Sequence, residues 1–370
     1  MIYKHFFKTL LLLSLFCKID SLGIALANDL PIYTPTTHQA IVTEVENEEH
    51  DNALEEIFQS EQIIQNLKIK ILSGDLSKQE FKLQNFLTNT PYFDIKLKKG
   101  DRILIDIDNI THEIYLATKD NSNIIIFLSS LFLAGLWLIY QKSSLKFIYG
   151  LLFCITIIFF ALIPLIFLSY NPIFWTMSVC VFLSAIIIFI TNGQKAQSTC
   201  STISTALSIF ILTLTSIILN HSSGIQGIDS PENIIIFGEY PRLNFMDIST
   251  SATILTATGA LIYLSQIISN YIFLYFTPKD NFNDVLSSVK NFSKTPIFQL
   301  FFVLIFSKIG LLFPLILLSY QTNLLKFINL NRFFLELSSL ILILIIMLLS
   351  VPITTLICNI YTKRNLITKK

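Results

Sequence analysis

A single lysine interrupts one of the long apolar stretches of this chain. Lys308 lies near the middle of the run Ile297–Tyr320. An ammonium group in the hydrocarbon of a membrane costs about 3 kcal/mol or more unless it is paired or hydrated. No aspartate or glutamate is expected at the same depth, so Tyr263 and Gln266, central in another run, are the expected hydrogen-bond partners. These three residues define a candidate polar site inside the membrane.

A lysine in this position has two interpretations. It lines a cavity, where it binds a solute or takes part in proton movement, or it lies in a groove and extends its side chain toward water. Two acidic residues, Asp247 and Glu336, lie near the outer ends of their runs and are candidate contributors from that side. Asp247 precedes Ser249 in a pattern that resembles a helix N-cap, and we prefer that role to a catalytic one.

Three prolines lie inside apolar runs, each one or two helical turns from an end. They are Pro164, Pro314 and Pro352. A proline within a helix frees a carbonyl group and kinks the helix. We therefore treat the three as hinge candidates, with a plain packing role as the alternative.

The sequence carries no recognisable catalytic or metal-binding pattern. HExxH, GxSxG, Walker and GxGxxG patterns are absent, so we expect neither an enzyme nor a cofactor. None of the five cysteines falls between residues 28 and 122, and the histidines there are scattered, which predicts no disulfide framework and no metal site. The acidic segment Glu44–Glu56 resembles a cation site, but a solvated helix or loop is the simpler interpretation. A net charge of +1 offers no basic face for nucleic acid.

The elements that must position these residues are membrane spans. The chain has 53% hydrophobic and 14% charged residues, whereas soluble domains carry about 25% charge. Ser and Thr are frequent in the fourth and fifth runs, where they either pack helices closely or line a polar pathway. Seven runs are long enough to cross a bilayer: Ile124–Tyr140, Leu145–Ser169, Pro172–Ile190, Cys200–Leu219, Ile248–Phe276, Ile297–Tyr320 and Phe333–Tyr361. The sequence therefore predicts a polytopic α-helical membrane protein with seven transmembrane helices over residues 123–361.

The region before these runs predicts an exported β domain. Residues 1–27 combine Lys4 and Lys8, a short apolar core and Ala25-Leu26-Ala27, which is the pattern of a secretory signal peptide cleaved after Ala27; an uncleaved anchor is the alternative. We expect residues 28–39 to be a linker. Residues 40–122 alternate in polarity between Gly-Asp turns and predict a small extracytoplasmic β-barrel-like domain with a structural or docking role.

Basic residues fix the expected orientation. With the N-terminal domain outside, the short inner segments and the basic tail, residues 362–370, carry ten Lys and Arg residues, against three in the short outer loops. This excess agrees with the positive-inside rule and puts the C-terminus in the cytoplasm. The one long outer loop, 220–247, is a candidate lid or partner site.

A repeated motif suggests an internal duplication. The residues P-L-I-x-L-S-Y occur at 164–170 and again at 314–320, at the outer ends of the second and sixth runs. Spans one to three and five to seven would then be parallel copies joined by span four, a 3+1+3 arrangement, and parallel repeats recur in transporters. Chance similarity between two proline-containing apolar helix ends is the alternative.

Several short motifs, in order, resemble those of the YibE/F family of bacterial membrane proteins. The resemblance covers most of residues 40–361. It rests on the following segments: 71–74, 97–105, 163–165 with 171–173, 193–196, 259–262, 313–318 and 351–355. It implies a multi-pass protein of the bacterial cytoplasmic membrane with a permease-like fold.

The chain is a diverged member on this comparison. The family has an aspartate shortly after the Gly-Ala pair of its fifth span, where this chain has Tyr263. Before its sixth span the family has the run G-R-D-x-x-G-T-x-x-N-T. The corresponding segment here, 293–303, keeps Lys294 as its basic residue but lacks the acid, the glycines and the Asn-Thr pair of that run. We therefore hold two hypotheses. The protein is a permease for a small polar solute, or it is a scaffold whose extracytoplasmic domain docks a protein partner. In both, the lipid bilayer surrounds the spans.

Overall fold

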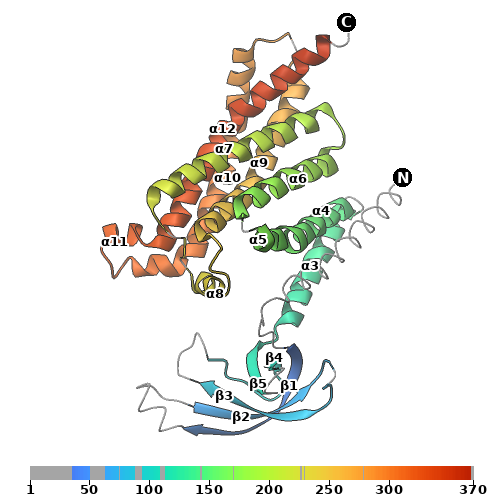
Figure 1. Ribbon diagram of the computed structural model, residues 1–370. Coiled ribbons are helices and arrows are strands. Elements are labelled where there is room, and N and C mark those ends of the chain that lie inside the picture. Colours follow the sequence, from blue (N-terminus) through green and yellow to red (C-terminus); the bar gives the residue numbers. More distant parts are fainter. Residues whose placement is uncertain are drawn as a thin grey trace. The chain divides into compact units, whose positions relative to one another are not determined.

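The computed structural model describes residues 36–50, 63–74, 76–87, 94–108, 113–141, 144–169, 171–225, 227–228, 230–277 and 279–367. The predicted signal peptide lies outside these residues. The described chain divides into two compact units, residues up to 141 and residues from 142 onward. The first contains a sheet and helix α3 (Ser122–Tyr140), and the second contains the other helices (Figure 1). Each unit is described by itself.

The first unit contains a curled, five-stranded antiparallel half-barrel sheet. Its strands are β1 (Thr36–His50), β2 (Ile63–Ile71), β3 (Glu80–Leu87), β4 (Arg102–Ile107) and β5 (Ile114–Lys119), in the order β3-β2-β1-β4-β5. The long strand β1 pairs with both β2 and β4, and its register with β2 shifts at two places. Such bulges increase local twist and bend a strand. The predicted antiparallel β domain is therefore confirmed as a curled sheet.

Alternation of side chains explains why these segments form strands. In β2, Leu67, Ile69 and Ile71 are buried in the sheet core, while Lys68 and Lys70 alternate with them. A period of two directs successive side chains to opposite faces, so one face excludes water and the other stays solvated.

The first strand was missed in the sequence, in two ways. β1 begins at Thr36, so the last four residues of the predicted linker 28–39 belong to the sheet. Residues 44–50, the first part of the predicted acidic segment, form strand instead of helix or loop, and the rest of that segment lies outside the described residues. The physical reason is cross-strand pairing: Lys68 Nζ lies 3.0 Å from Glu44 Oε2 and 2.9 Å from Glu46 Oε1. The hydrogen bond from Lys68 lowers the pKa of Glu46. Glu44 and Glu46 therefore form cross-strand ion pairs with Lys68, and such pairs stabilise a sheet.

A second ion pair in the sheet yields a pH prediction. Asp101 accepts hydrogen bonds from Lys119 Nζ at 2.8 Å and from the Lys98 N–H at 2.9 Å, and these lower the pKa of Asp101. A carboxyl whose pKa is lower in the folded state stabilises the fold above its unfolded value, about 3.9, and this stabilisation is lost as pH falls through the folded value. We expect Asp101→Asn to speed hydrogen exchange of β4 and β5 at neutral pH, with the difference narrowing below about pH 4. The exposed Lys99→Met is the control, and a difference independent of pH would contradict this account.

Seven helical segments of the described chain are long and apolar enough to span a membrane. They are α3; α4 (Ser144–Ile157), η3 (Ile158–Leu162) and α5 (Ile163–Ser169) as one segment; α6 (Pro172–Asn192); α7 (Ala196–Ser223); α9 (Phe245–Tyr275); α10 (Phe282–Leu318); and α12 (Asn331–Ile367). Two short helices, α8 (Pro231–Glu239) and α11 (Leu324–Ile328), complete the described set. The predicted seven-span fold is confirmed. The last helix continues to Ile367, beyond the predicted boundary at 361, so much of the basic tail is helical.

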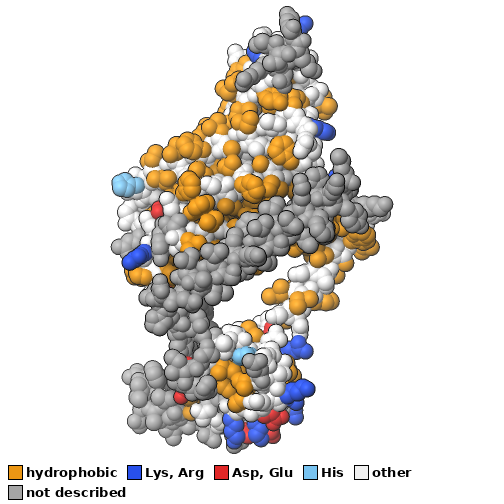
Figure 2. Space-filling view, turned by 45° about the vertical axis from the view of Figure 1, so that its right-hand side comes forward, with side chains coloured by type: hydrophobic (Ala, Val, Ile, Leu, Met, Phe, Trp, Pro, Cys, Tyr) orange, Lys and Arg blue, Asp and Glu red, His pale blue; other side chains and the backbone are white. Residues whose placement is uncertain are grey.

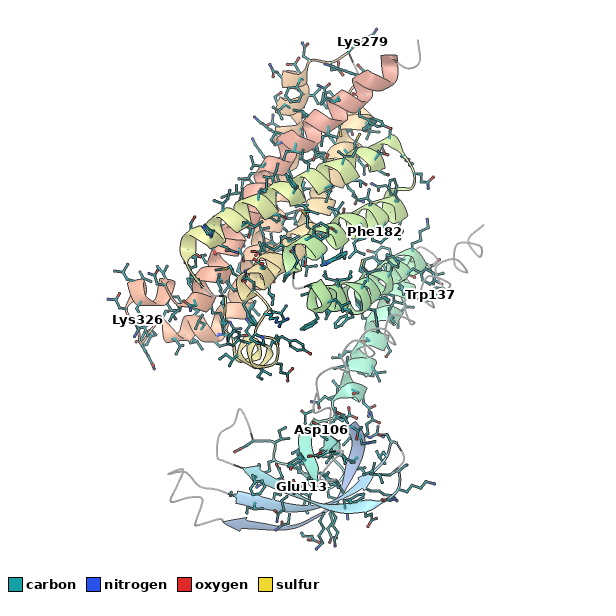
Figure 3. All side chains as sticks on the ribbon, viewed as in Figure 1. Asp106, Glu113, Trp137, Phe182, Lys279 and Lys326 are labelled. Atoms are coloured by element: carbon teal, nitrogen blue, oxygen red, sulfur yellow. The ribbon has the colours of Figure 1, made fainter. Side chains whose placement is uncertain are left out.

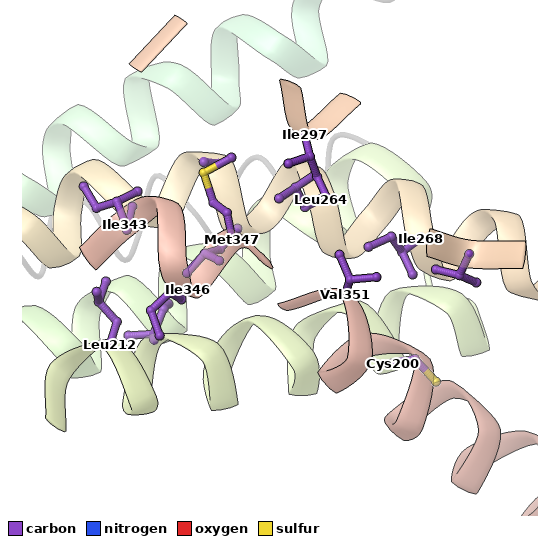
Figure 4. Packing of buried hydrophobic residues seen from close by; sticks show 14 of the residues in the cluster. Cys200, Leu212, Leu264, Ile268, Ile297, Ile343, Ile346, Met347 and Val351 are labelled. Carbon is purple, nitrogen blue, oxygen red and sulfur yellow. The ribbon is translucent and has the colours of Figure 1, made fainter. Parts of the chain in front are cut away.

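The core of the second unit forms around α9. This helix packs against α6, α7, α10 and α12, and it is the most buried of the spans. Figure 4 shows the centre of this packing, where Leu264 and Ile268 of α9 belong to the same cluster as Ile346 of α12 and Leu212 of α7. Figure 2 shows hydrophobic side chains over the visible face of the helices, as expected of surfaces that contact lipid.

Hydroxyl groups join the central helices to each other. Thr205 Oγ1 of α7 lies 2.7 Å from Ser265 Oγ of α9, and Ser201 Oγ donates to the Ser265 carbonyl oxygen at 3.2 Å. Most other hydroxyls donate to a carbonyl group three or four residues earlier in their own helix, as Ser204 does. These contacts agree with the close-packing interpretation of the Ser- and Thr-rich spans.

Candidate functional site

The intramembrane lysine pairs with an acid. Lys308 of α10 donates a hydrogen bond from Nζ to the Glu336 carboxylate of α12. The two side chains are only 15% and 25% exposed. A charged pair with this little exposure lies within two of the membrane-length helices, where each charge alone would be costly. The pair is the centre of the candidate site.

The expected partners of this lysine were wrong. Gln266 Nε2 of α9 donates instead to Thr191 Oγ1 of α6 at 2.7 Å, and Tyr263 is 43% exposed on α9. The pairing of Lys308 with Glu336 follows from where the two helices end. α10 ends at Leu318, only ten residues or about 15 Å beyond Lys308, and Glu336 lies five residues or about 8 Å inside α12. The flexible stem of lysine bridges the remaining difference in depth.

Asp247 belongs to a second polar site, at the end of the helical unit where α7 ends and α9 begins. A pocket of about 330 Å³ opens there. Its polar lining residues are Asn220, His221, Asn244, Asp247 and Thr250. Asn220 Nδ2 of α7 donates to Thr250 Oγ1 of α9 at 2.5 Å, which ties the two walls together.

The predicted cap role of Asp247 was wrong. Asn244 caps α9 instead, since its side chain accepts a hydrogen bond from the Met246 N–H at 3.0 Å. Asp247 lies in the first turn, where a carboxylate also interacts favourably with the helix dipole. Its carboxylate takes part in no hydrogen bond or ion pair within the described part of the chain. Its side chain lines the pocket.

The hinge candidates lie within spanning segments. Pro164 is the second residue of α5, which follows the π-helical turn Ile158–Leu162, whereas Pro314 and Pro352 lie inside α10 and α12. A π-bulge and a proline both leave backbone groups unpaired in a helix. The sequence did not single out Pro296, which is also inside α10, because the sixth run was expected to begin only at Ile297. Hinge motion at these sites stays a prediction.

The sequence does not predict that the residues of this pocket lie together. Loop 220–247 was expected to be a lid or partner site, but nothing in the sequence joined His221 and Asn220 to Asp247. These residues meet at a turn in which Gly227 packs closely against the start of α9. Over the described residues, no group of three or more His, Cys, Asp or Glu side chains is placed to hold a metal ion.

Fold and site together define a class: a polytopic membrane protein with a separate antiparallel sheet domain and a charged pair within its spans. Residues 128–364 match the family described as YibE/F-like protein, and residues 32–120 match the YibE/F family N-terminal domain. The chain therefore belongs to the YibE/F family. No curated protein and no solved structure matches it significantly.

Proposed function

We propose that this YibE/F family protein is a permease for a small polar solute in the cytoplasmic membrane of a bacterium. The single observation that carries the proposal is the Lys308–Glu336 pair within α10 and α12. A buried ion pair is poor evidence for stability, because desolvation offsets much of the attraction. Charged residues within spans commonly mark ion and proton pathways instead.

The proposed orientation follows the distribution of basic residues. Residues 28–122 are exported and the C-terminus is cytoplasmic, because Lys and Arg are concentrated in the segments assigned to the inside. Lys279, between α9 and α10, and Lys326, on α11, lie at opposite ends of the helical unit (Figure 3). In this orientation Lys279 faces the cytoplasm, and the α7–α9 pocket opens to the outside.

Flux through proteoliposomes tests the proposal. A panel of labelled amines, amino acids and organic acids is offered to vesicles with wild-type protein, the Lys308→Met variant, or no protein. We expect at least one solute to move faster through wild-type vesicles, and the variant to lose about tenfold or more of that rate per folded molecule. Equal flux in variant and wild type would remove Lys308 from the mechanism. Wild-type flux no greater than that of empty vesicles would overturn the permease proposal for the panel.

One observation favours a scaffold as the second candidate. The sheet and α3 form a compact unit of their own, and Phe86 and Tyr115 are about half exposed on the strands β3 and β5. Exposed aromatic side chains are common in protein interfaces. Crosslinking through residues 36–119 of the full chain, followed by mass spectrometry, separates the two candidates. A stable protein partner together with absent flux would favour the scaffold.

A further inference from the structure

The α7–α9 pocket has the composition of an organic-cation site. Among the described residues that line the pocket, Asp247 is the one carboxylic acid. Asn220 and Thr250 also line the pocket and carry side-chain oxygens that can accept hydrogen bonds, while Ile217, Ile225 and Met246 supply apolar surface. Positive charge, hydrogen-bond donors and a short carbon skeleton are the ligand features that this lining complements.

The carboxylate of Asp247 is the observation that points to a ligand. The acids of the sheet, such as Asp101 and Glu46, are paired with lysines, and Glu336 is paired with Lys308. Asp247 is partly buried and has no such partner among the described residues. A carboxylate removed from water without a compensating cation is costly, so a bound cation would restore the missing interaction.

The size of the pocket distinguishes between kinds of cation. A volume of about 330 Å³ exceeds the share of one water, about 30 Å³, by roughly an order of magnitude. Calcium takes six to eight oxygen ligands in a close shell, which one carboxylate and a few amide and hydroxyl groups over this volume do not provide. A primary ammonium on a small carbon skeleton fits both the volume and the mixed lining.

We propose that the α7–α9 pocket binds a small primary ammonium compound, with the Asp247 carboxylate accepting hydrogen bonds from its charged nitrogen. This deepens the proposed function by naming a solute class, and it rests on that function only for the further step in which the bound cation is moved. Asn220 and Thr250, already joined to each other, form the polar wall beside the ammonium. The apolar residues contact the carbon chain.

Equilibrium binding tests the site apart from transport. Labelled ethanolammonium is dialysed against full-length protein in nanodiscs of zwitterionic lipid, with empty nanodiscs as blank. Ethylene glycol, the uncharged compound of the same shape, is the competitor control. We expect saturable binding with a Kd on the order of 0.1–10 mM for so small a ligand. We expect ethylene glycol not to displace it.

Two variants locate the binding. Asp247→Asn keeps the shape and removes the charge, and should weaken binding about tenfold or more, whereas Asp247→Glu should retain most of it. An unchanged melting temperature of the protein confirms that each variant is folded. Binding that is equal in wild type and Asp247→Asn, or that ethylene glycol abolishes, would overturn the site. Binding at Asp247 without any flux would support the site and overturn the permease.

Discussion

Replacing Lys308 by methionine will lower the free energy of unfolding by about 3–5 kcal/mol. The change removes the ammonium but leaves the Glu336 carboxylate, 25% exposed, without its partner between α10 and α12. Breaking a buried ion pair by removing one member costs this much because the remaining charge keeps its desolvation penalty and loses its attraction. Unfolding in mixed micelles of increasing denaturing-detergent fraction measures the difference.

The double variant separates stability from function. With Lys308→Met and Glu336→Gln together, no uncompensated charge remains, and we expect most of the lost stability to return. Flux should stay low, since both charged groups are gone. The matched control is Lys326→Met, which removes a lysine from the short helix α11. A double variant as unstable as the single one would show that the ion pair itself is not the source of the loss.

The spans were predictable from sequence because their signal is local. Each apolar run is long enough to be recognised without its neighbours, and all seven correspond to helices. Their ends were less certain: α10 begins at Phe282, and a segment with Asp284 and Lys290 did not look like part of an apolar run. Polar residues at the end of a long helix carry no local mark that distinguishes them from a loop.

The partners of the polar residues were not predictable, because depth in the membrane depends on where each helix ends. An error of a few residues at the start of α12 moves Glu336 by several ångströms, enough to hide its pairing with Lys308. β1 was missed for a related reason. Its acids resemble a solvated loop until β2 brings Lys68 opposite Glu44. Both the Lys308–Glu336 pair and the pairing of β1 with β2 are contacts between residues far apart in the sequence, so local patterns did not predict them.

The 3+1+3 repeat stays a prediction, although both copies of its motif fall at the ends of helices, α5 and α10.

Substitution of Gly227 by alanine is expected to destabilise the pocket end of the helical unit by about 2–5 kcal/mol. Gly227 has a φ of +78°, a conformation that costs an L-residue about 1–2 kcal/mol. A Cβ there would also lie 2.6 Å from the Phe245 carbonyl carbon and 2.7 Å from the Met246 nitrogen, which are backbone atoms that cannot rotate away. Overpacking of this kind adds about 1–3 kcal/mol.

Gly224 is the matched control for this substitution. It has a similar φ of +65°, but a Cβ there meets nothing within 4 Å, so Gly224→Ala carries only the backbone cost, about 1–2 kcal/mol. Because the clash at Gly227 pushes on the start of α9, it should displace the first turn that holds Asp247 and weaken ethanolammonium binding. Gly224 itself lines the pocket, so Gly224→Ala is a control for stability only. Equal losses of stability in the two variants would show that the loop moves away from α9 freely. The position of the first turn of α9 would then not depend on Gly227.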